Sequence, residues 1–181
     1  MRKVLLFLGI LDDSDVDWMM ANGKRVDSPV GEVLIREGSE VDAMFLVIDG
    51  SYQVTVGRRE IAKLNPGEIV GEMSFVDSRP PSASVKALER SLVLSIPRSR
   101  LTQKLAEDTP FAARFYRALA VMLVDRLRSS VIQLGYGEAG PYQAQVDDRD
   151  ELDPNVLENL DLAGSRFDSI QRRLRAVGSA G

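Results

Sequence analysis

The amino-acid sequence predicts a mainly β protein with flanking α-helices, built around a β-sandwich or jelly-roll barrel. Residues 24–96 contain seven or eight short apolar or alternating segments separated by glycine-containing turns, a pattern typical of such barrels. Residues 110–134 then form one long amphipathic segment. We therefore expect a domain at residues 1–134 that ends in this long helix, a linker at 135–150 and a helical tail at 151–181.

Two N-terminal segments are expected to pack on the barrel. Residues 1–10 are mostly apolar and form a strand or a helix, because their apolar run of about seven residues is short for a signal peptide. Residues 13–22 carry acids in their first turn and are followed by Gly23, which predicts a short amphipathic helix. Trp18, the single tryptophan, is expected to be a packing residue.

Two of the strand segments predict different degrees of burial. Residues 43–48 are continuously apolar, which indicates a strand covered on both faces. Residues 52–56 alternate between apolar and polar side chains, which indicates a half-buried strand, and Asp49-Gly50 before them is a tight-turn signal. The remaining strands are expected at residues 32–35, 60–64, 84–88 and 91–96.

The long helix is predicted from its ends and from its apolar stripes. Pro97 ends the last strand and residues 99–107 form a short helix; Thr109 is then the expected N-cap, with Pro110 in the first turn and a stop at Gly135. One stripe holds Phe111, Phe115 and Met122, and a second holds Leu119, Leu123, Leu127, Val131 and Leu134. A helix with two apolar stripes must bury both. The barrel takes one, which leaves the other for a second subunit or for the chain's own tail.

The tail combines an acidic segment with a basic one. Residues 147–161 contain seven acids and one arginine, and Asp153-Pro154 is a good helix start. Ser165 is the expected cap of a last helix that carries Phe167, Ile170, Leu174 and Val177 on one side and Arg166, Arg172, Arg173 and Arg175 on a basic face. This helix is expected to fold onto its own domain or to bind a partner protein, rather than a membrane.

The composition argues against several classes of function. The formal net charge is −4 without a basic run, which argues against a nucleic-acid partner. The chain has no Cys and no His, so thiolate or histidine catalysis and Cys- or His-ligated metals are excluded. We expect no enzyme activity, no cofactor and no metal. No segment approaches the roughly 20 apolar residues of a membrane span, so a cytoplasmic protein without a membrane partner is expected.

Residues 67–85 form the most informative stretch. Gly71-Glu72 is followed by a loop of proline and small polar residues that leads to Ser82-Ala83-Ser84-Val85. Such a loop lets backbone N–H groups converge on a concavity that favours an anion. The stretch resembles the phosphate-binding cassette of the cyclic nucleotide-binding domain family, whose pattern is Gly-Glu-aliphatic followed by Arg-small-Ala-x-Val. The order of elements over about residues 5–134 resembles the same family.

The resemblance implies a cyclic nucleotide-binding-type jelly roll that acts as a sensor for cAMP, cGMP or a related cyclic nucleotide. Glu72 would accept a hydrogen bond from the ribose 2′-OH, Ser82 and Ala83 would bind the phosphate, and Ser130 would contact the base. The site residues by this resemblance are Gly71, Glu72, Met73, Ser74, Arg79, Ser82, Ala83 and Ser130. The alternative is that Glu72 caps the cassette backbone and the other side chains are solvated. In the catabolite-activator-type members, the helix equivalent to 110–134 pairs two subunits.

One residue departs from the family pattern. Pro81 stands where the family has its phosphate-pairing arginine, and Arg79 is the nearest arginine. A charged hydrogen bond contributes roughly 1.5–3 kcal/mol, so its loss costs about tenfold or more in affinity. The alternative function is therefore a degenerate member that binds no nucleotide and acts as a dimeric protein–protein adaptor. Residues 135–181 lack a helix–Gly turn–recognition helix pattern, which argues against a transcription factor.

Overall fold

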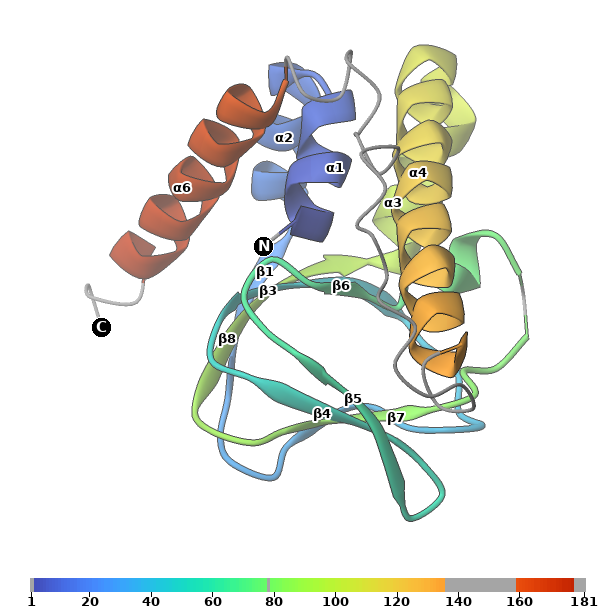
Figure 1. Ribbon diagram of the computed structural model, residues 1–181. Coiled ribbons are helices and arrows are strands. Elements are labelled where there is room, and N and C mark those ends of the chain that lie inside the picture. Colours follow the sequence, from blue (N-terminus) through green and yellow to red (C-terminus); the bar gives the residue numbers. More distant parts are fainter. Residues whose placement is uncertain (1, 78, 136–158, 178–181) are drawn as a thin grey trace.

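The computed structural model, which describes residues 2–77, 79–135 and 159–177, contains a β-barrel with helices gathered over one side (Figure 1). The strands are β1 Lys24–Ser28, β2 Val33–Ile35, β3 Ala43–Asp49, β4 Tyr52–Val56, β5 Arg59–Leu64, β6 Ile69–Val70, β7 Ser84–Ala87 and β8 Ser91–Pro97. They form two antiparallel four-stranded sheets, in the orders β1-β8-β3-β6 and β2-β7-β4-β5. The predicted mainly β class, with a jelly-roll barrel and flanking helices, is confirmed.

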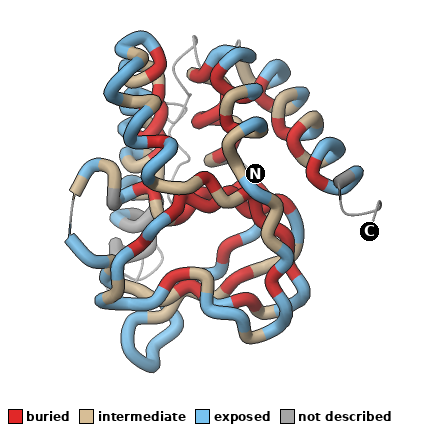
Figure 2. Tube along the Cα trace, turned by 180° about the vertical axis from the view of Figure 1, so that it is seen from behind, coloured by how far each residue is buried: buried red, intermediate tan, exposed pale blue. Residues whose placement is uncertain are grey.

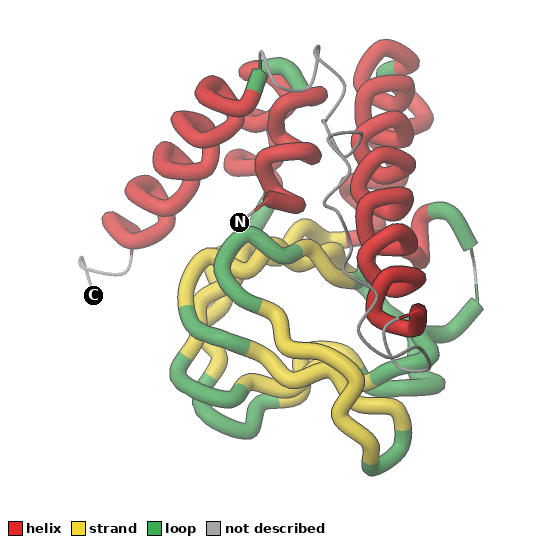
Figure 3. The backbone as a smooth tube through the Cα atoms, in the orientation of Figure 1, coloured by secondary structure: helices red, strands yellow, loops and turns green. Residues whose placement is uncertain are grey.

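The helices lie over the sheet β1-β8-β3-β6, as the colours of Figure 3 show. They are α1 Arg2–Ile10, α2 Asp13–Asn22, the 3₁₀ helix η1 Glu72–Phe75, α3 Arg98–Glu107, α4 Thr109–Gly135 and α6 Leu160–Val177. α1 is a helix, the second of the two forms expected for it, and it lies between α4 and α6 (Figure 1). Within the described ranges, no helix has the length and apolar character needed to cross a bilayer.

The strand β3 separates two hydrophobic cores. Met44, Leu46 and Ile48 contribute to the core under the helices, whereas Phe45 and Val47 contribute to the core inside the barrel. The prediction that residues 43–48 are covered on both faces is therefore confirmed, because all six are buried. β4 lies in the other sheet, and its burial falls from the buried Tyr52 through three partly buried residues to the exposed Val56. Figure 2 shows the buried residues concentrated where the helices meet the barrel.

Two predicted helix caps are wrong. The residue that caps α4 is Asp108, whose Oδ1 accepts a hydrogen bond from the Phe111 N–H at 2.9 Å, and Thr109 is already helical. A carboxylate one residue earlier reaches the free N–H groups of the first turn and adds a favourable charge there. Ser165 lies inside α6 rather than at its start, and its hydroxyl donates to the Asp161 carbonyl at 3.1 Å.

The second apolar stripe of α4 is largely exposed. Leu119 is buried with the first stripe, but Leu127 is 64% exposed and Val131 is 59% exposed. Of the two coverings expected for this stripe, the described part of the tail does not provide one, because α6 packs on α1 instead. Gly135, the first residue of the predicted linker, is the last residue of α4. The rest of that linker and the helix start at Asp153-Pro154 lie outside the described residues, as does the side chain of Leu134.

Candidate functional site

Gly71 sets the path of the cassette along the barrel wall. Its φ is +80°, in the left-handed region that favours glycine, and it caps the N-terminus of η1. A Cβ built on it would lie 2.5 Å from the Ala43 carbonyl oxygen of β3. Glycine therefore meets two requirements here: it allows the turn, and it lets the cassette backbone pass close against β3.

The next residue, Glu72, is buried and ion-paired. Its side chain is 2% exposed, and its Oε1 accepts a hydrogen bond from Arg126 Nη1 at 2.5 Å. Arg126 Nη2 also donates to the Ile69 carbonyl at 2.9 Å. Charge-assisted hydrogen bonds of this kind are short and strong. One guanidinium from α4 therefore binds the cassette on both sides of Gly71.

Arg126 is the site residue that the sequence analysis missed. A signal for it exists: Arg126 lies four residues after Met122 and eleven after Phe115, both fully buried. Residues at these spacings share one face of a helix. A guanidinium on the buried face of a helix needs an acceptor, and Glu72 is the buried carboxylate that the fold brings to it.

Arg79 lies on the outer side of the cassette loop. Its side chain is 86% exposed, and its Nε donates to Asp77 Oδ2 at 2.5 Å while its backbone N–H donates to Asp77 Oδ1 at 3.0 Å. These bonds, the backbone one first and the guanidinium second, lower the pKa of the Asp77 carboxyl. In this structure Arg79 is thus a partner of Asp77 at the surface. It does not contribute to the buried side of the cassette, formed by Gly71 and Glu72 where they face β3 and Arg126, which we call the inner wall.

The end of the cassette is fixed to the loops of the other sheet. The Pro81 carbonyl accepts a hydrogen bond from the Gly38 N–H at 2.9 Å, and Ser84 Oγ accepts one from the Glu37 N–H at 2.9 Å. Ser82 is exposed and Ala83 is partly buried. The bond at Pro81 uses only its backbone carbonyl, and proline offers neither a charge nor an N–H group where the resemblance would place an arginine.

The remaining predicted site residues are dispersed. Met73 is 58% exposed, on the η1 turn next to Glu72. Ser74 lies on the same turn and Ser130 near the end of α4, but both side chains are outside the described part of the structure. The structure thus brings together Gly71, Glu72 and Arg126, and whether the predicted set binds a ligand stays a prediction. Among the described residues, no cluster of three or more acidic side chains is arranged to hold a metal ion.

The comparisons with known proteins identify the fold and the family. Residues 25–108 match the family model described as "Cyclic nucleotide-binding domain", and this range includes the whole cassette. The match identifies residues 25–108 as a cyclic nucleotide-binding domain. A crystal structure of a cyclic nucleotide-binding domain from Methylobacillus flagellatus has a TM-score of 0.66 and 24% identity, and the alignment covers 78% of this chain and 85% of that one.

Two curated relatives show how far the similarity extends. The chain is 31% identical over 139 residues to the "Cyclic AMP receptor protein" of Thermus thermophilus, which covers 74% of this chain and 62% of the relative. It is 29% identical over 110 residues to the "Pycsar effector protein XpPycTIR" of Xanthomonas perforans, which covers 60% of this chain and 35% of the relative. The chain thus spans less than two thirds of the length of either protein.

Proposed function

We propose that this chain is a non-enzymatic sensor module that binds a cyclic nucleotide, such as cAMP or cGMP, in the cassette 67–85 and reports it through α4 and the tail. The observation that carries the proposal is the buried Glu72–Arg126 ion pair, which joins Gly71-Glu72, the residues that fit the family pattern, to the long helix. The match to the cyclic nucleotide-binding domain model supports the ligand class. The ion pair supports the output, because a change at Glu72 acts directly on α4.

The ligand would act by competing for the two charged groups. A ribose hydroxyl needs an acceptor such as the Glu72 carboxylate, and a cyclic phosphate needs a donor such as the Arg126 guanidinium. Both groups now bind each other, with Arg126 also bound to the Ile69 carbonyl. A nucleotide that binds the unpaired arrangement more tightly shifts the population towards it, and α4 is then free to move relative to the cassette.

We also propose a homodimer through helix 110–134. Its exposed apolar side chains are Tyr116 at 44%, Val124 at 49%, Leu127 at 64% and Val131 at 59%. Val124, Leu127 and Val131 are three and four residues apart, which fits one seam of an α-helical coiled coil, whereas Tyr116 lies beside that seam. Substitution Leu127→Glu at the centre of the seam should convert a dimer to a monomer in sedimentation analysis, and a wild-type chain that sediments as a monomer at high concentration would contradict this part.

The test of the sensor is a calorimetric titration of the chain with cAMP, cGMP and cyclic dinucleotides. We expect saturable binding that is weakened about tenfold or more in Glu72→Ala, because a hydrogen bond to a charged group is lost. Glu72→Gln keeps an acceptor of the same size and should have an intermediate effect. Arg79→Ala is the matched control, and we expect it to bind like the wild type because its side chain lies outside the inner wall.

The second candidate function is a dimeric adaptor that binds no nucleotide. Two observations favour it. Pro81 has no charged side chain to bind a phosphate, and the Arg79 guanidinium already donates a hydrogen bond to Asp77. Absence of heat with every nucleotide, from a chain that unfolds cooperatively, would reject the sensor and leave the adaptor. Loss of binding in Arg79→Ala would instead show that the loop rearranges to bring Arg79 to the ligand.

A further inference from the structure

The helix α6 is seated on the N-terminal helices by an apolar stripe. Ala163, Phe167, Ile170 and Leu174 are buried in the same core as Leu8 and Leu11 at the end of α1. The helices cross closely, since a Cβ built on Gly9 would lie 3.7 Å from the Ala163 Cβ. In Figure 1, α6 lies on the side of α1 opposite α4, so α1 touches both the long helix and the tail.

Arg166 binds the end of α1 from the centre of this seat. Its Nη1 donates to the carbonyls of Leu8 at 2.7 Å and Leu11 at 2.6 Å, and its Nε donates to Asp13 Oδ1 at 2.7 Å. The last carbonyls of a helix have no partners within it and favour a cation. The last turn of α1 contains no basic residue. α6 therefore supplies the C-terminal cap that the sequence of α1 lacks.

The far end of α6 is held by two part-buried hydrogen bonds to backbone carbonyls and by two exposed ion pairs. Arg25 Nη1 of β1 donates to the Leu174 carbonyl at 2.6 Å. The other contacts are Gln171 Nε2 to the Ile48 carbonyl at 3.0 Å, Arg173 to Asp17 at 2.7 Å and Arg175 to Asp49 at 3.2 Å. Exposed ion pairs of this kind contribute little and weaken with salt.

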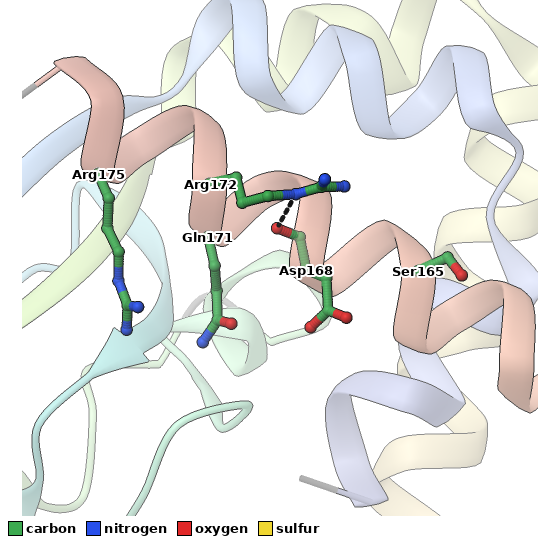
Figure 4. Close-up of a pocket in the computed structure, with 5 residues that line it drawn as sticks. All are labelled: Ser165, Asp168, Gln171, Arg172 and Arg175. Carbon is green, nitrogen blue, oxygen red and sulfur yellow. Dashed lines mark hydrogen bonds between the residues drawn. The ribbon is translucent and has the colours of Figure 1, made fainter.

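One flank of α6 borders a surface pocket. The pocket has a volume of about 370 Å³ and is lined by Ser165, Asp168, Gln171, Arg172 and Arg175 (Figure 4). All five side chains are polar or charged, so this flank adds no apolar burial to the attachment of α6. The attachment of α6 therefore depends mainly on the apolar stripe and on the bonds that Arg166 makes to α1.

The opposite end of α1 is tied to the cassette. Lys3 Nζ and Glu68 Oε2 form an ion pair at 2.8 Å, with side-chain exposures of 25% and 12%. Glu68 is adjacent to Ile69, whose carbonyl binds Arg126. Between its ends, α1 packs on α4 through Phe7 and Phe115, whose ring centroids are 5.8 Å apart. α1 thus contacts the cassette at one end and the tail at the other.

We propose that α6 is a detachable latch, and that the cassette sets its docking through α1. A movement of the cassette at Glu68 would pull α1 at Lys3 and displace the Leu8 and Leu11 carbonyls from Arg166, which releases α6 and exposes its apolar stripe to a partner. The role of a nucleotide as the trigger rests on the proposed function above. By linkage, a ligand that weakens the docking of α6 by a given factor is itself bound more weakly, by the same factor, when α6 is docked.

The test is hydrogen–deuterium exchange of the full chain, read over residues 160–177. Loss of the Arg166 bonds in Arg166→Gln should raise exchange of α6 about tenfold or more, the factor that a charged hydrogen bond corresponds to. Arg172→Gln is the matched control, because Arg172 is exposed and its Nε donates at 3.4 Å to Asp168 within α6 itself. Unchanged exchange over residues 43–49 and 91–97 verifies that the barrel is intact in both variants.

The decisive variant is Glu68→Gln, which removes the charge at the other end of α1. It should raise exchange over residues 160–177 by a smaller factor than Arg166→Gln, although Glu68 makes its ion pair with α1 rather than with α6. The control is Glu107→Gln in α3, whose carboxylate accepts a bond from Gln103 of its own helix. Equal exchange of α6 in Glu68→Gln and in the wild type would overturn the proposal, and so would wild-type exchange in Arg166→Gln.

A nucleotide arm separates this proposal from the proposed function. If cAMP or cGMP binds and exchange of residues 160–177 rises at saturation, both stand. If either binds with no change in α6, the latch is overturned and the sensor remains. If neither binds, the sensor is overturned, and the Glu68→Gln result alone decides whether the cassette controls the latch.

Discussion

Two arginine–carboxylate pairs of the same chemistry lie on opposite sides of the cassette, and their environments differ. On the inner wall, Glu72 and Arg126 are 2% and 29% exposed and are separated by 54 residues in the sequence. On the outer loop, Asp77 and Arg79 are 39% and 86% exposed and lie two residues apart. The inner pair joins the barrel to α4, whereas the outer pair stabilises only its own turn.

The difference teaches that proximity in sequence is a poor guide to the charged partner of a site. Arg79 is the arginine nearest in sequence to Pro81. It bonds to Asp77, only two residues away, and this local bond does not require the loop to bring Arg79 close to Glu72. Arg126 is distant in sequence and is brought to Glu72 by the packing of α4. Burial then makes the inner pair costly to break, while solvent screens the outer pair.

The largest effect is expected for a substitution on the inner wall, Gly71→Ala. The added Cβ would be held at a φ of +80° and would lie 2.5 Å from the Ala43 carbonyl. Backbone strain and overpacking together should lower the free energy of unfolding by about 2–5 kcal/mol. Urea denaturation measures this change as a lower midpoint at an unchanged slope.

The matched control for Gly71 is Gly57, at the turn between β4 and β5. Gly57 also has a positive φ, +56°, but a Cβ built on it meets nothing within 4 Å. Gly57→Ala should therefore cost only the conformational penalty, about 1 kcal/mol. Equal losses in the two variants would mean that the close approach of the cassette to β3 is not a constraint.

A smaller loss is expected when the inner ion pair is broken in Glu72→Ala. The substitution leaves Arg126 partly buried with its carboxylate partner gone, and we expect a loss of about 2 kcal/mol, below the range for fully buried pairs because Arg126 is 29% exposed. The double variant Glu72→Ala/Arg126→Met removes both charges and should recover part of this loss. If the loss of stability in the double variant equals the sum of the losses in Glu72→Ala and Arg126→Met, the two side chains do not stabilise each other.

The smallest effect is expected on the outer loop, where Arg79→Ala should lower the denaturation midpoint only slightly because the ion pair is exposed. The pKa of Asp77 should still move. It is lowered first by the backbone N–H of residue 79, which alanine keeps, and then by the guanidinium, which alanine lacks. The pKa should therefore rise part of the way to its ordinary value, as an NMR titration would measure.

The sign of the pH dependence follows from this lowered pKa. A carboxyl group whose pKa is lower in the folded than in the unfolded state stabilises the fold above the ordinary aspartate range, and this contribution disappears as the pH falls through the folded-state pKa. In Arg79→Ala, the pH range in which ionised Asp77 stabilises the fold should therefore begin at a higher pH than in the wild type. An Asp77 pKa identical in variant and wild type would show that the guanidinium has no influence on it.

Elements with a strong local signal could be predicted from the sequence. The continuous apolar run of β3 correctly predicted a strand buried on both faces. The alternation of β4 predicted a half-buried strand, and its residues are on average partly buried, but Val56 is exposed instead of inward. The helix at 13–22 was predicted with the bounds that the structure has. The caps at Thr109 and Ser165 were wrong because Asp108 and the start of α6 at Leu160 offered competing local choices.

The sequence by itself determined the fold class, the family and the place of the cassette, because glycine turns, apolar periodicity and the Gly71-Glu72 pattern are all local. Only the tertiary structure decided which arginine faces Glu72, and that α6 lies on α1 while the exposed stripe of α4 stays uncovered by it. The physical reason is that one cation can pair with any carboxylate it reaches. Several arginines and acids compete, and the packing of the helices on the barrel selects between them.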